Sequence, residues 1–173
     1  MRTIRSIGSL ALFSIAVATS GRAQVEARYS KTEVRVPMRD GTRLFTVVYA
    51  PRDTSLRYPI MMTRTPYSVG PYGPNAYPSR LGPSQRFTDE GFIFVYQDVR
   101  GRFMSEGDFK HMTPWKGMAG AAKTDESTDT YDTIDWLVKH VAHNNGRVGI
   151  WGISYAVFCL KKKIVNSHPA LKA

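Results

Sequence analysis

The fold is indicated most clearly by one run near the end of the chain, Arg147-Val148-Gly149-Ile150-Trp151-Gly152-Ile153-Ser154-Tyr155. Apolar residues typical of a buried strand lead to Gly152 and, two residues later, to Ser154. A strand that turns sharply into a helix at a Gly-x-Ser sequence lifts the serine hydroxyl off the end of a sheet, and the next backbone N–H can stabilise an oxyanion. The run therefore predicts a nucleophile elbow at Ser154. A serine that only caps the following helix is the alternative.

The preceding sequence predicts several strands. Residues 32–38 alternate between polar and apolar side chains, as in a half-buried strand, and Asp40-Gly41 is a hairpin turn signal. Residues 44–49 are rich in β-branched and aromatic side chains, so we expect an antiparallel hairpin after a polar lead-in over residues 24–31. Further strands are predicted over residues 60–63, 92–96 and 148–151.

Helices are predicted over residues 84–90, 125–141 and 156–166, and irregular loops over residues 66–83 and 99–123. The helix over 125–141 has apolar side chains at helical spacing, and acidic residues crowd its first half, where they complement the helix dipole. We interpret Asp129, Asp132 and Asp135 as an exposed, solvated face of this helix. Helical segments between apolar strands predict a parallel sheet with crossover helices.

The N-terminus has the three parts of a secretory signal peptide. Residues 1–5 are basic, residues 10–18 are apolar, and Gly21-Arg22-Ala23 places small residues where a signal peptidase cleaves. We therefore expect residues 1–23 to be a signal peptide, with a mature domain over 24–173 that is exported and not membrane-bound after cleavage. An N-terminal membrane anchor is the alternative.

Charge and cysteine content exclude several classes of protein. The formal net charge of +10 falls to +7 without residues 1–23, which contain three arginines and no acidic residue. The basic residues do not form a stripe with interleaved aromatics, so we expect no nucleic-acid partner. The single cysteine, Cys159, cannot form an internal disulfide, and no Cys/His spacing suggests zinc. The spacing Gly149-x-x-Gly152 does not match a dinucleotide-binding fingerprint.

Several ordered motifs carry a resemblance to a known family: Val36-Pro37-Met38-Arg39-Asp40-Gly41, Thr63-Arg64-Thr65-Pro66-Tyr67, Gln97-Asp98-Val99-Arg100-Gly101-Arg102, Asp129-Thr130-Tyr131-Asp132-Thr133-Ile134-Asp135-Trp136-Leu137 and Gly152-Ile153-Ser154-Tyr155. In these the chain resembles the α/β-hydrolases that include α-amino acid ester hydrolases, cocaine esterase and X-Pro dipeptidyl-peptidases. The resemblance implies an α/β-hydrolase fold. Its N-terminal half would have a mostly parallel sheet that opens with an antiparallel hairpin and is truncated after the elbow helix.

The resemblance also implies roles for three residues. Ser154 would be the acylated nucleophile, the backbone N–H of Tyr155 one oxyanion donor, and the Tyr67 hydroxyl the other. Tyr67 could instead be a packing aromatic in a tyrosine-rich loop. The implied substrate is a small ester, an amide or a short peptide, such as an α-amino acyl or X-Pro compound, with no cofactor and no metal. Asp98 and Arg100 are expected to pair with each other and brace the loops beside the site.

Two features depart from the family pattern. Val157 stands where relatives carry glycine, and Lys161-Lys162-Lys163 falls on a helix that is expected to be buried. In relatives the catalytic acid, the histidine and a β-sandwich domain follow later than residue 173, so we expect residues 24–173 to be a partial catalytic domain with little or no esterase activity of its own. The alternative function is a truncated, non-catalytic remnant.

Overall fold

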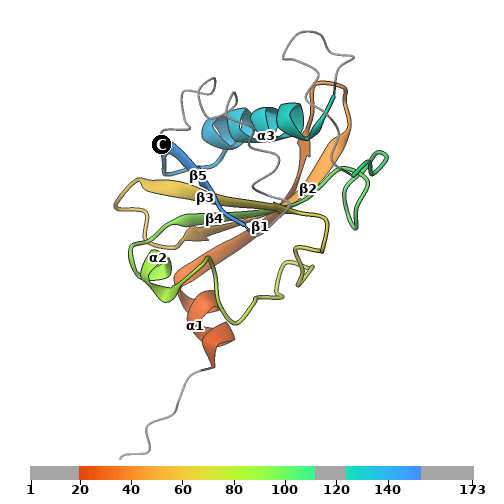
Figure 1. Ribbon diagram of the computed structural model, residues 1–173. Coiled ribbons are helices and arrows are strands. Elements are labelled where there is room, and N and C mark those ends of the chain that lie inside the picture. Colours follow the sequence, from red (N-terminus) through yellow and green to blue (C-terminus); the bar gives the residue numbers. More distant parts are fainter. Residues whose placement is uncertain (1–19, 112–123, 153–173) are drawn as a thin grey trace, which may run out of the picture.

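A computed structural model of the chain describes residues 20–111 and 124–152, coloured in Figure 1. Along the chain its elements are α1 (Gly21–Arg28), β1 (Tyr29–Pro37), β2 (Arg43–Pro51), β3 (Tyr58–Thr65), α2 (Gln85–Asp89), β4 (Ile93–Asp98), α3 (Glu126–His140) and β5 (Asn144–Ile150). No helix among these residues is long and apolar enough to cross a membrane.

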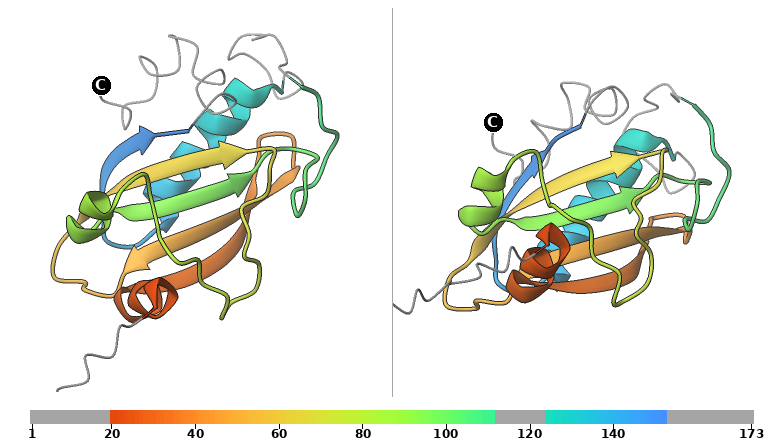
Figure 2. Two further views of the ribbon diagram at one scale, coloured as in Figure 1. Left: turned by 60° about the horizontal axis from the view of Figure 1, so that its bottom comes forward. Right: turned by 90° about the horizontal axis from the view of Figure 1, so that it is seen from below.

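The strands form one mixed sheet in the order β1-β2-β4-β3-β5. β1 pairs with β2 and β2 with β4 in antiparallel fashion, whereas β3 is parallel to both β4 and β5. Helix α3 covers one face of the sheet, and α1, α2 and the long loop before α2 lie on the other (Figures 1 and 2). The predicted α/β architecture, with an opening hairpin and a parallel portion, is confirmed.

The β1–β2 hairpin closes where the sequence predicts. Pro37 pairs with Arg43, the Met38 N–H donates to the Thr42 carbonyl at 2.8 Å, and Gly41 has a φ of +83°. Glycine reaches that left-handed conformation without the steric penalty that a side chain brings, which is why Asp-Gly is a good turn signal.

The face of the sheet beneath α3 holds an aliphatic core, made of Val48, Tyr58, Ile60, Met62, Ile93, Val95, Ile134, Leu137 and Val148. Nearly every residue of β4 is buried, as expected for a central strand with both faces covered. The opposite face is more aromatic and packs Val25, Tyr29, Phe45, Val47, Tyr49, Val69, Leu81 and Phe94. These two cores fix the strands whose ends carry the candidate site.

Helix α3 matches its predicted range closely. Asp125 is the N-cap, and a reciprocal capping box joins its carboxylate to the Thr128 N–H and the Thr128 hydroxyl to the Asp125 N–H. Helix α1 differs from the expected polar lead-in: Ser20 caps it and the Val25 side chain is buried. The expected signal cleavage after Ala23 thus falls inside α1, and that cleavage remains a prediction.

Candidate active site

The carboxyl ends of three parallel strands meet at one edge of the sheet. Thr65, the last residue of β3, pairs with Asp98, the last residue of β4. Beyond the end of β5, the Trp151 N–H donates to the Met62 carbonyl at 3.0 Å, and the Thr63 hydroxyl donates to the Trp151 carbonyl at 3.0 Å. The chain that leads from β5 toward the predicted nucleophile is therefore held against β3.

The described residues end at Gly152, so Ser154 and Tyr155 lie outside them, as do Val157 and the three consecutive lysines. The described part of the predicted elbow is the strand β5 and the two residues that follow it. Gly152 has a φ of +159°, at the limit of the range that favours glycine. The predicted roles of Ser154 and Tyr155 remain predictions.

Tyr67 follows β3 directly at the same edge. Its N–H donates to the Thr65 hydroxyl at 3.0 Å, and the carbonyl of the preceding Pro66 accepts from the Arg102 guanidinium at 3.1 Å. The Tyr67 side chain is 72% exposed, so it does not fill the aromatic core of this loop. The role of the Tyr67 hydroxyl as an oxyanion donor remains a prediction.

Asp98 binds the loop that carries Tyr67, and it does not pair with Arg100 as expected. The Asp98 side chain is fully buried, and one carboxylate oxygen accepts from the Val69 N–H at 3.0 Å. The other accepts from the Tyr72 hydroxyl at 2.9 Å and from the Met104 N–H at 3.3 Å. Burial raises the pKa of Asp98 above the usual carboxyl value, although these three donors act to lower it.

The loop after Tyr67 is held further along by a buried lysine. The Lys31 ammonium donates to the carbonyls of Pro71 and Gly73 at 2.7 Å and of Ala76 at 2.9 Å, and it contacts the Glu33 carboxylate at 2.9 Å. Its side chain has no exposed surface. The predicted irregular loop is therefore tied to β1 and β4 by two buried charged groups.

A cavity of about 420 Å³ lies between this loop and the sheet. Hydroxyl-bearing residues line much of it, namely Tyr49, Thr63, Thr65, Ser68, Ser79 and Tyr96. Among the described residues, the buried Tyr49 hydroxyl has no hydrogen-bond partner. The cavity thus combines apolar surface with several hydroxyl groups and is large enough for a small molecule.

On the opposite face of the sheet, Arg64 forms the centre of a buried polar network. Its guanidinium donates to the Gln97 side chain at 2.7 Å, to the Glu126 carbonyl at 2.9 Å and to the Thr130 hydroxyl. The Gln97 amide in turn donates to the Thr46 hydroxyl at 2.9 Å. Strands β2, β3 and β4 are thereby joined to the start of α3, directly beneath the site.

The predicted exposed face of α3 is wrong for two of its three residues. Asp129 is buried and accepts from the Arg100 guanidinium at 2.7 Å, while Asp132 accepts from Arg39 at 2.7 Å with only 14% of its side chain exposed. Asp135 does lie at the surface and pairs with Lys139. The Asp129 and Asp132 carboxylates therefore join α3 to neighbouring segments and do not form a solvated face.

Arg100 connects α3 to the hairpin turn. Besides Asp129, its guanidinium contacts the Asp40 carboxylate at 2.8 Å. Burial lowers the pKa of Arg100, but the hydrogen bonds to both carboxylates outweigh burial and raise it above the ordinary value. Arg100, which was expected to pair with Asp98 beside the site, instead joins α3 to the hairpin turn.

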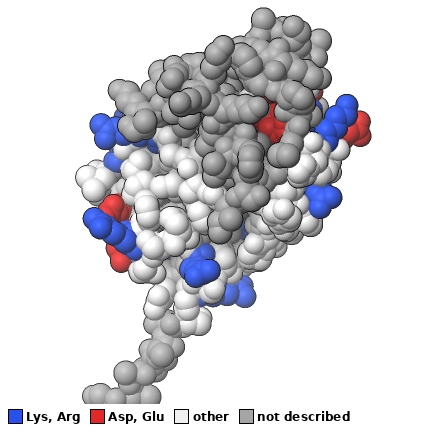
Figure 3. All heavy atoms as spheres, in the orientation of Figure 1, with Lys and Arg blue, Asp and Glu red and all other residues white. Residues whose placement is uncertain are grey.

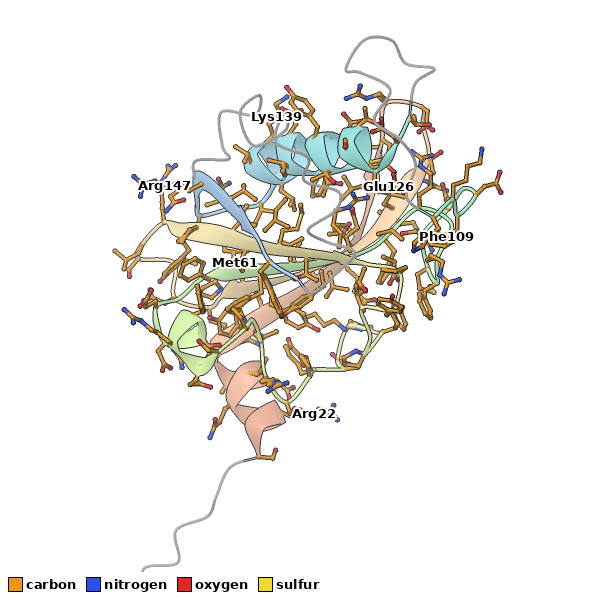
Figure 4. The ribbon with its side chains drawn as sticks, in the orientation of Figure 1. Arg22, Met61, Phe109, Glu126, Lys139 and Arg147 are labelled. Atoms are coloured by element: carbon orange, nitrogen blue, oxygen red, sulfur yellow. The ribbon has the colours of Figure 1, made fainter. Side chains whose placement is uncertain are left out.

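The two edges of the sheet differ in their side chains. In Figure 4, Glu126 and Phe109 lie toward the edge where β3 and β4 end, whereas Lys139 and Arg147 lie at the opposite edge. His140 ends α3 and His143 precedes β5, which places both at the edge away from Tyr67.

On the face drawn in Figure 3, the described Lys and Arg residues are scattered, and several lie beside Asp or Glu.

Comparisons with known proteins agree with this arrangement. The family model of X-Pro dipeptidyl-peptidase (S15 family) matches residues 40–173. A cocaine esterase from Rhodococcus sp. (strain MB1 Bresler) is 32% identical over 150 residues, which is 86% of this chain and 24% of the esterase.

Two solved structures are also similar. An α-amino acid ester hydrolase has a TM-score of 0.71 and 36% identity, over 95% of this chain and 28% of its own. An aminopeptidase from the marine sediment archaeon Thaumarchaeota archaeon has a TM-score of 0.68 and 34% identity, over 99% of this chain and 28% of its own. The chain spans about a quarter of the length of the relatives that it matches. It belongs to the X-Pro dipeptidyl-peptidase (S15) family, whose members are hydrolases that include esterases and peptidases.

Proposed function

We propose that this chain carries the nucleophile and the oxyanion donors of a serine hydrolase. The Ser154 oxygen attacks the carbonyl carbon of an ester or amide while a general base takes its proton. The carbonyl oxygen becomes an oxyanion, which the Tyr155 N–H and the Tyr67 hydroxyl stabilise. Collapse expels the alcohol or amine and leaves an acyl-enzyme, which water then hydrolyses.

The observation that carries this proposal is the alignment of β3 with β5. The Thr63–Trp151 hydrogen bond holds the residues just past β5 beside β3, at 3.0 Å. Two residues beyond Gly152 comes Ser154, and two residues beyond Thr65 comes Tyr67. Because parallel strands advance at the same rise per residue, β3 and β5 reach the same edge of the sheet at a similar level, and we propose that Ser154 follows there.

The substrate is proposed from the relatives and from the cavity. The names of the similar proteins refer to esters of cocaine and of α-amino acids, and to peptides. We propose an ester or amide of a small acyl group, including α-amino acyl and X-Pro compounds. The cavity of about 420 Å³ beside the Tyr67 loop is within the size range of small-molecule sites.

A fluorophosphonate probe tests the nucleophile. We expect the full chain to be labelled on the peptide that contains Ser154, as identified by mass spectrometry, although slowly, in keeping with the little or no esterase turnover expected of residues 24–173. The Ser154→Ala variant should stay unlabelled. The exposed Ser55, in the loop between β2 and β3 and outside the cavity, provides a matched control, since Ser55→Ala should label like the wild type. An unlabelled wild-type chain would favour the non-catalytic remnant, and labelling that persists in Ser154→Ala would exclude Ser154 as the nucleophile.

A further inference from the structure

We propose that Asp98 is a positioning residue that holds Tyr67 in place as an oxyanion donor. This inference rests on the proposed function, because it assigns Asp98 a task within that same site. The role proposed for Asp98 is one of positioning and not of contact with the substrate. It acts through the main chain and side chains on both sides of Tyr67.

Asp98 is costly to bury, which sets it apart from Asp129 and Asp132. Asp129 has arginine partners, and Asp132 pairs with Arg39. No Lys, Arg or His nitrogen within residues 20–111 and 124–152 forms an ion pair with the Asp98 carboxylate, which instead has three neutral donors. A buried charge without a counter-ion is retained only where its hydrogen bonds hold something in place.

The donors to Asp98 come from segments on both sides of its strand. Val69 and Tyr72 belong to the loop after Tyr67, and their N–H and hydroxyl groups lie 3.0 and 2.9 Å from the carboxylate. The Tyr72 hydroxyl also contacts the Ser68 hydroxyl at 2.9 Å, and Ser68 has a φ of +84°. A serine in this left-handed conformation is unusual and needs its surroundings to hold it.

The second segment restrains the residue before Tyr67. Met104 donates its N–H to the Asp98 carboxylate at 3.3 Å, and the Ser105 hydroxyl donates to the Asp98 carbonyl at 2.6 Å. The same turn presents Arg102, whose guanidinium holds the Pro66 carbonyl at 3.1 Å. Asp98 thus joins the segment that fixes residue 66 to the segment that fixes residues 68 and 69.

Asparagine at this position should break the arrangement with little change in shape. Both oxygens of Asp98 are used as acceptors, one for Val69 and one for Tyr72 and Met104. The Asn side chain replaces one oxygen with an NH₂ group, which faces an N–H donor instead of accepting from it. The Tyr67 loop then loses an anchor while the sheet stays intact.

A double-mutant cycle on the rate of fluorophosphonate labelling tests the inference. The four proteins are the wild type, Tyr67→Phe, Asp98→Asn and the double variant. We expect Tyr67→Phe to slow labelling about 100-fold, as for loss of one oxyanion donor. Asp98→Asn should slow it about 10-fold or more, and the double variant should be no slower than Tyr67→Phe alone, because Asp98 acts through Tyr67.

Two further variants separate positioning from general destabilisation. Tyr72→Phe removes one contact of Asp98 but keeps the carboxylate, so it should slow labelling less than Asp98→Asn and also add nothing to Tyr67→Phe. Asp132→Asn changes a mostly buried carboxylate on α3 that does not touch the loop, so it should leave labelling within about twofold of the wild type.

Different outcomes overturn different claims. If the double variant is slowed by the product of the two single fold-reductions in labelling rate, the positioning role of Asp98 is overturned. The proposed function would still stand. Labelling that Tyr67→Phe does not change would overturn the role of Tyr67 in the proposed function, and the positioning role with it. If Asp98→Asn does not fold, the same cycle with Tyr72→Phe decides the question.

Discussion

At the scale of single residues, the main finding is that the carboxylates of this chain have specific partners. Asp132 binds Arg39, which lies 93 residues earlier in the sequence, and Asp98 binds the loop that carries Tyr67. Helical spacing and local charge do not reveal such partners, because the contacts depend on how distant segments pack. The prediction of an exposed acidic face on α3 was wrong for this reason.

Other features of the site could be predicted from the sequence. The Tyr67 motif and the run toward Ser154 were recognised from their residues, and the structure places the described parts of both at one edge of the sheet. The role of Arg64 was missed, although it stands three residues before Tyr67. Arg64 directly follows the predicted strand over residues 60–63 and continues the alternation of Ile60 and Met62, which was the available signal.

Arg64 is predicted to be essential for stability. Arg64→Ala removes a fully buried guanidinium. The Gln97 side chain loses a donor, and Asp129 keeps Arg100 as its remaining arginine partner. We expect the free energy of unfolding to fall by about 3–5 kcal/mol, as when one member of a buried ionic network is removed. Urea unfolding followed by circular dichroism measures this. The exposed Arg147→Ala should change stability by less than about 0.5 kcal/mol, and a similarly small effect of Arg64→Ala would contradict the prediction.

Asp98 should also give stability a defined dependence on pH. Burial raises its pKa in the folded chain, so the folded state binds a proton more tightly than the unfolded state. The contribution of Asp98 is therefore complete below about pH 4, where an unfolded aspartate also becomes protonated, and it is lost as the pH rises through the folded-state pKa. We expect the stability difference between wild type and Asp98→Asn to shrink over that range. A difference that stays constant or grows with pH would be inconsistent with a raised pKa.

At the scale of elements, local patterns predicted most of the structure. Asp40-Gly41 located the hairpin, the continuous apolar run identified β4, and the acidic start and apolar stripe identified α3. Helix α1 was not predicted because its own sequence is short and polar. It is stabilised by contacts with residues that are distant in the sequence. For example, the Arg28 guanidinium binds the Asp89 carboxylate at 2.9 Å.

The capping box of α3 is predicted to contribute measurably to stability. Asp125→Ala leaves the Thr128 N–H without its side-chain acceptor at the start of the helix. We expect the free energy of unfolding to fall by about 1 kcal/mol, within the usual range for loss of an N-cap. Thermal unfolding measures the effect. Asp135→Ala, which removes an exposed pair with Lys139, should lose about 0.3–0.5 kcal/mol, so equal losses in the two variants would contradict a special role for the cap.

At the scale of the whole molecule, the strand order brings distant motifs to one place. Because β3 lies between β4 and β5, the residues that follow all three strands leave the same edge. The sequence motifs indicated the family, but only the strand order shows how Thr63, Asp98 and Trp151 contribute to one site.

Export is a second proposal at this scale. We propose that residues 1–23 are removed as a signal peptide, so that the mature chain begins near Gln24. Edman sequencing of the protein recovered from outside the cytoplasm should then start near Gln24.

Cleavage would remove the Ser20 cap and the Arg22–Asn75 hydrogen bond but keep the buried Val25. We expect a chain that starts at Gln24 to be less stable by only about 1 kcal/mol. Recovery of an intact Met1 would contradict export by cleavage.

The most direct measurement of the central claim is a crystal structure of the chain after reaction with the fluorophosphonate. The account predicts a covalent bond from the Ser154 oxygen to phosphorus. It also predicts that the phosphonyl oxygen accepts hydrogen bonds from the Tyr155 N–H and the Tyr67 hydroxyl, each at about 2.7–3.1 Å. A chain that does not react at Ser154, or an adduct whose oxygen points away from the Tyr67 hydroxyl, would contradict the account.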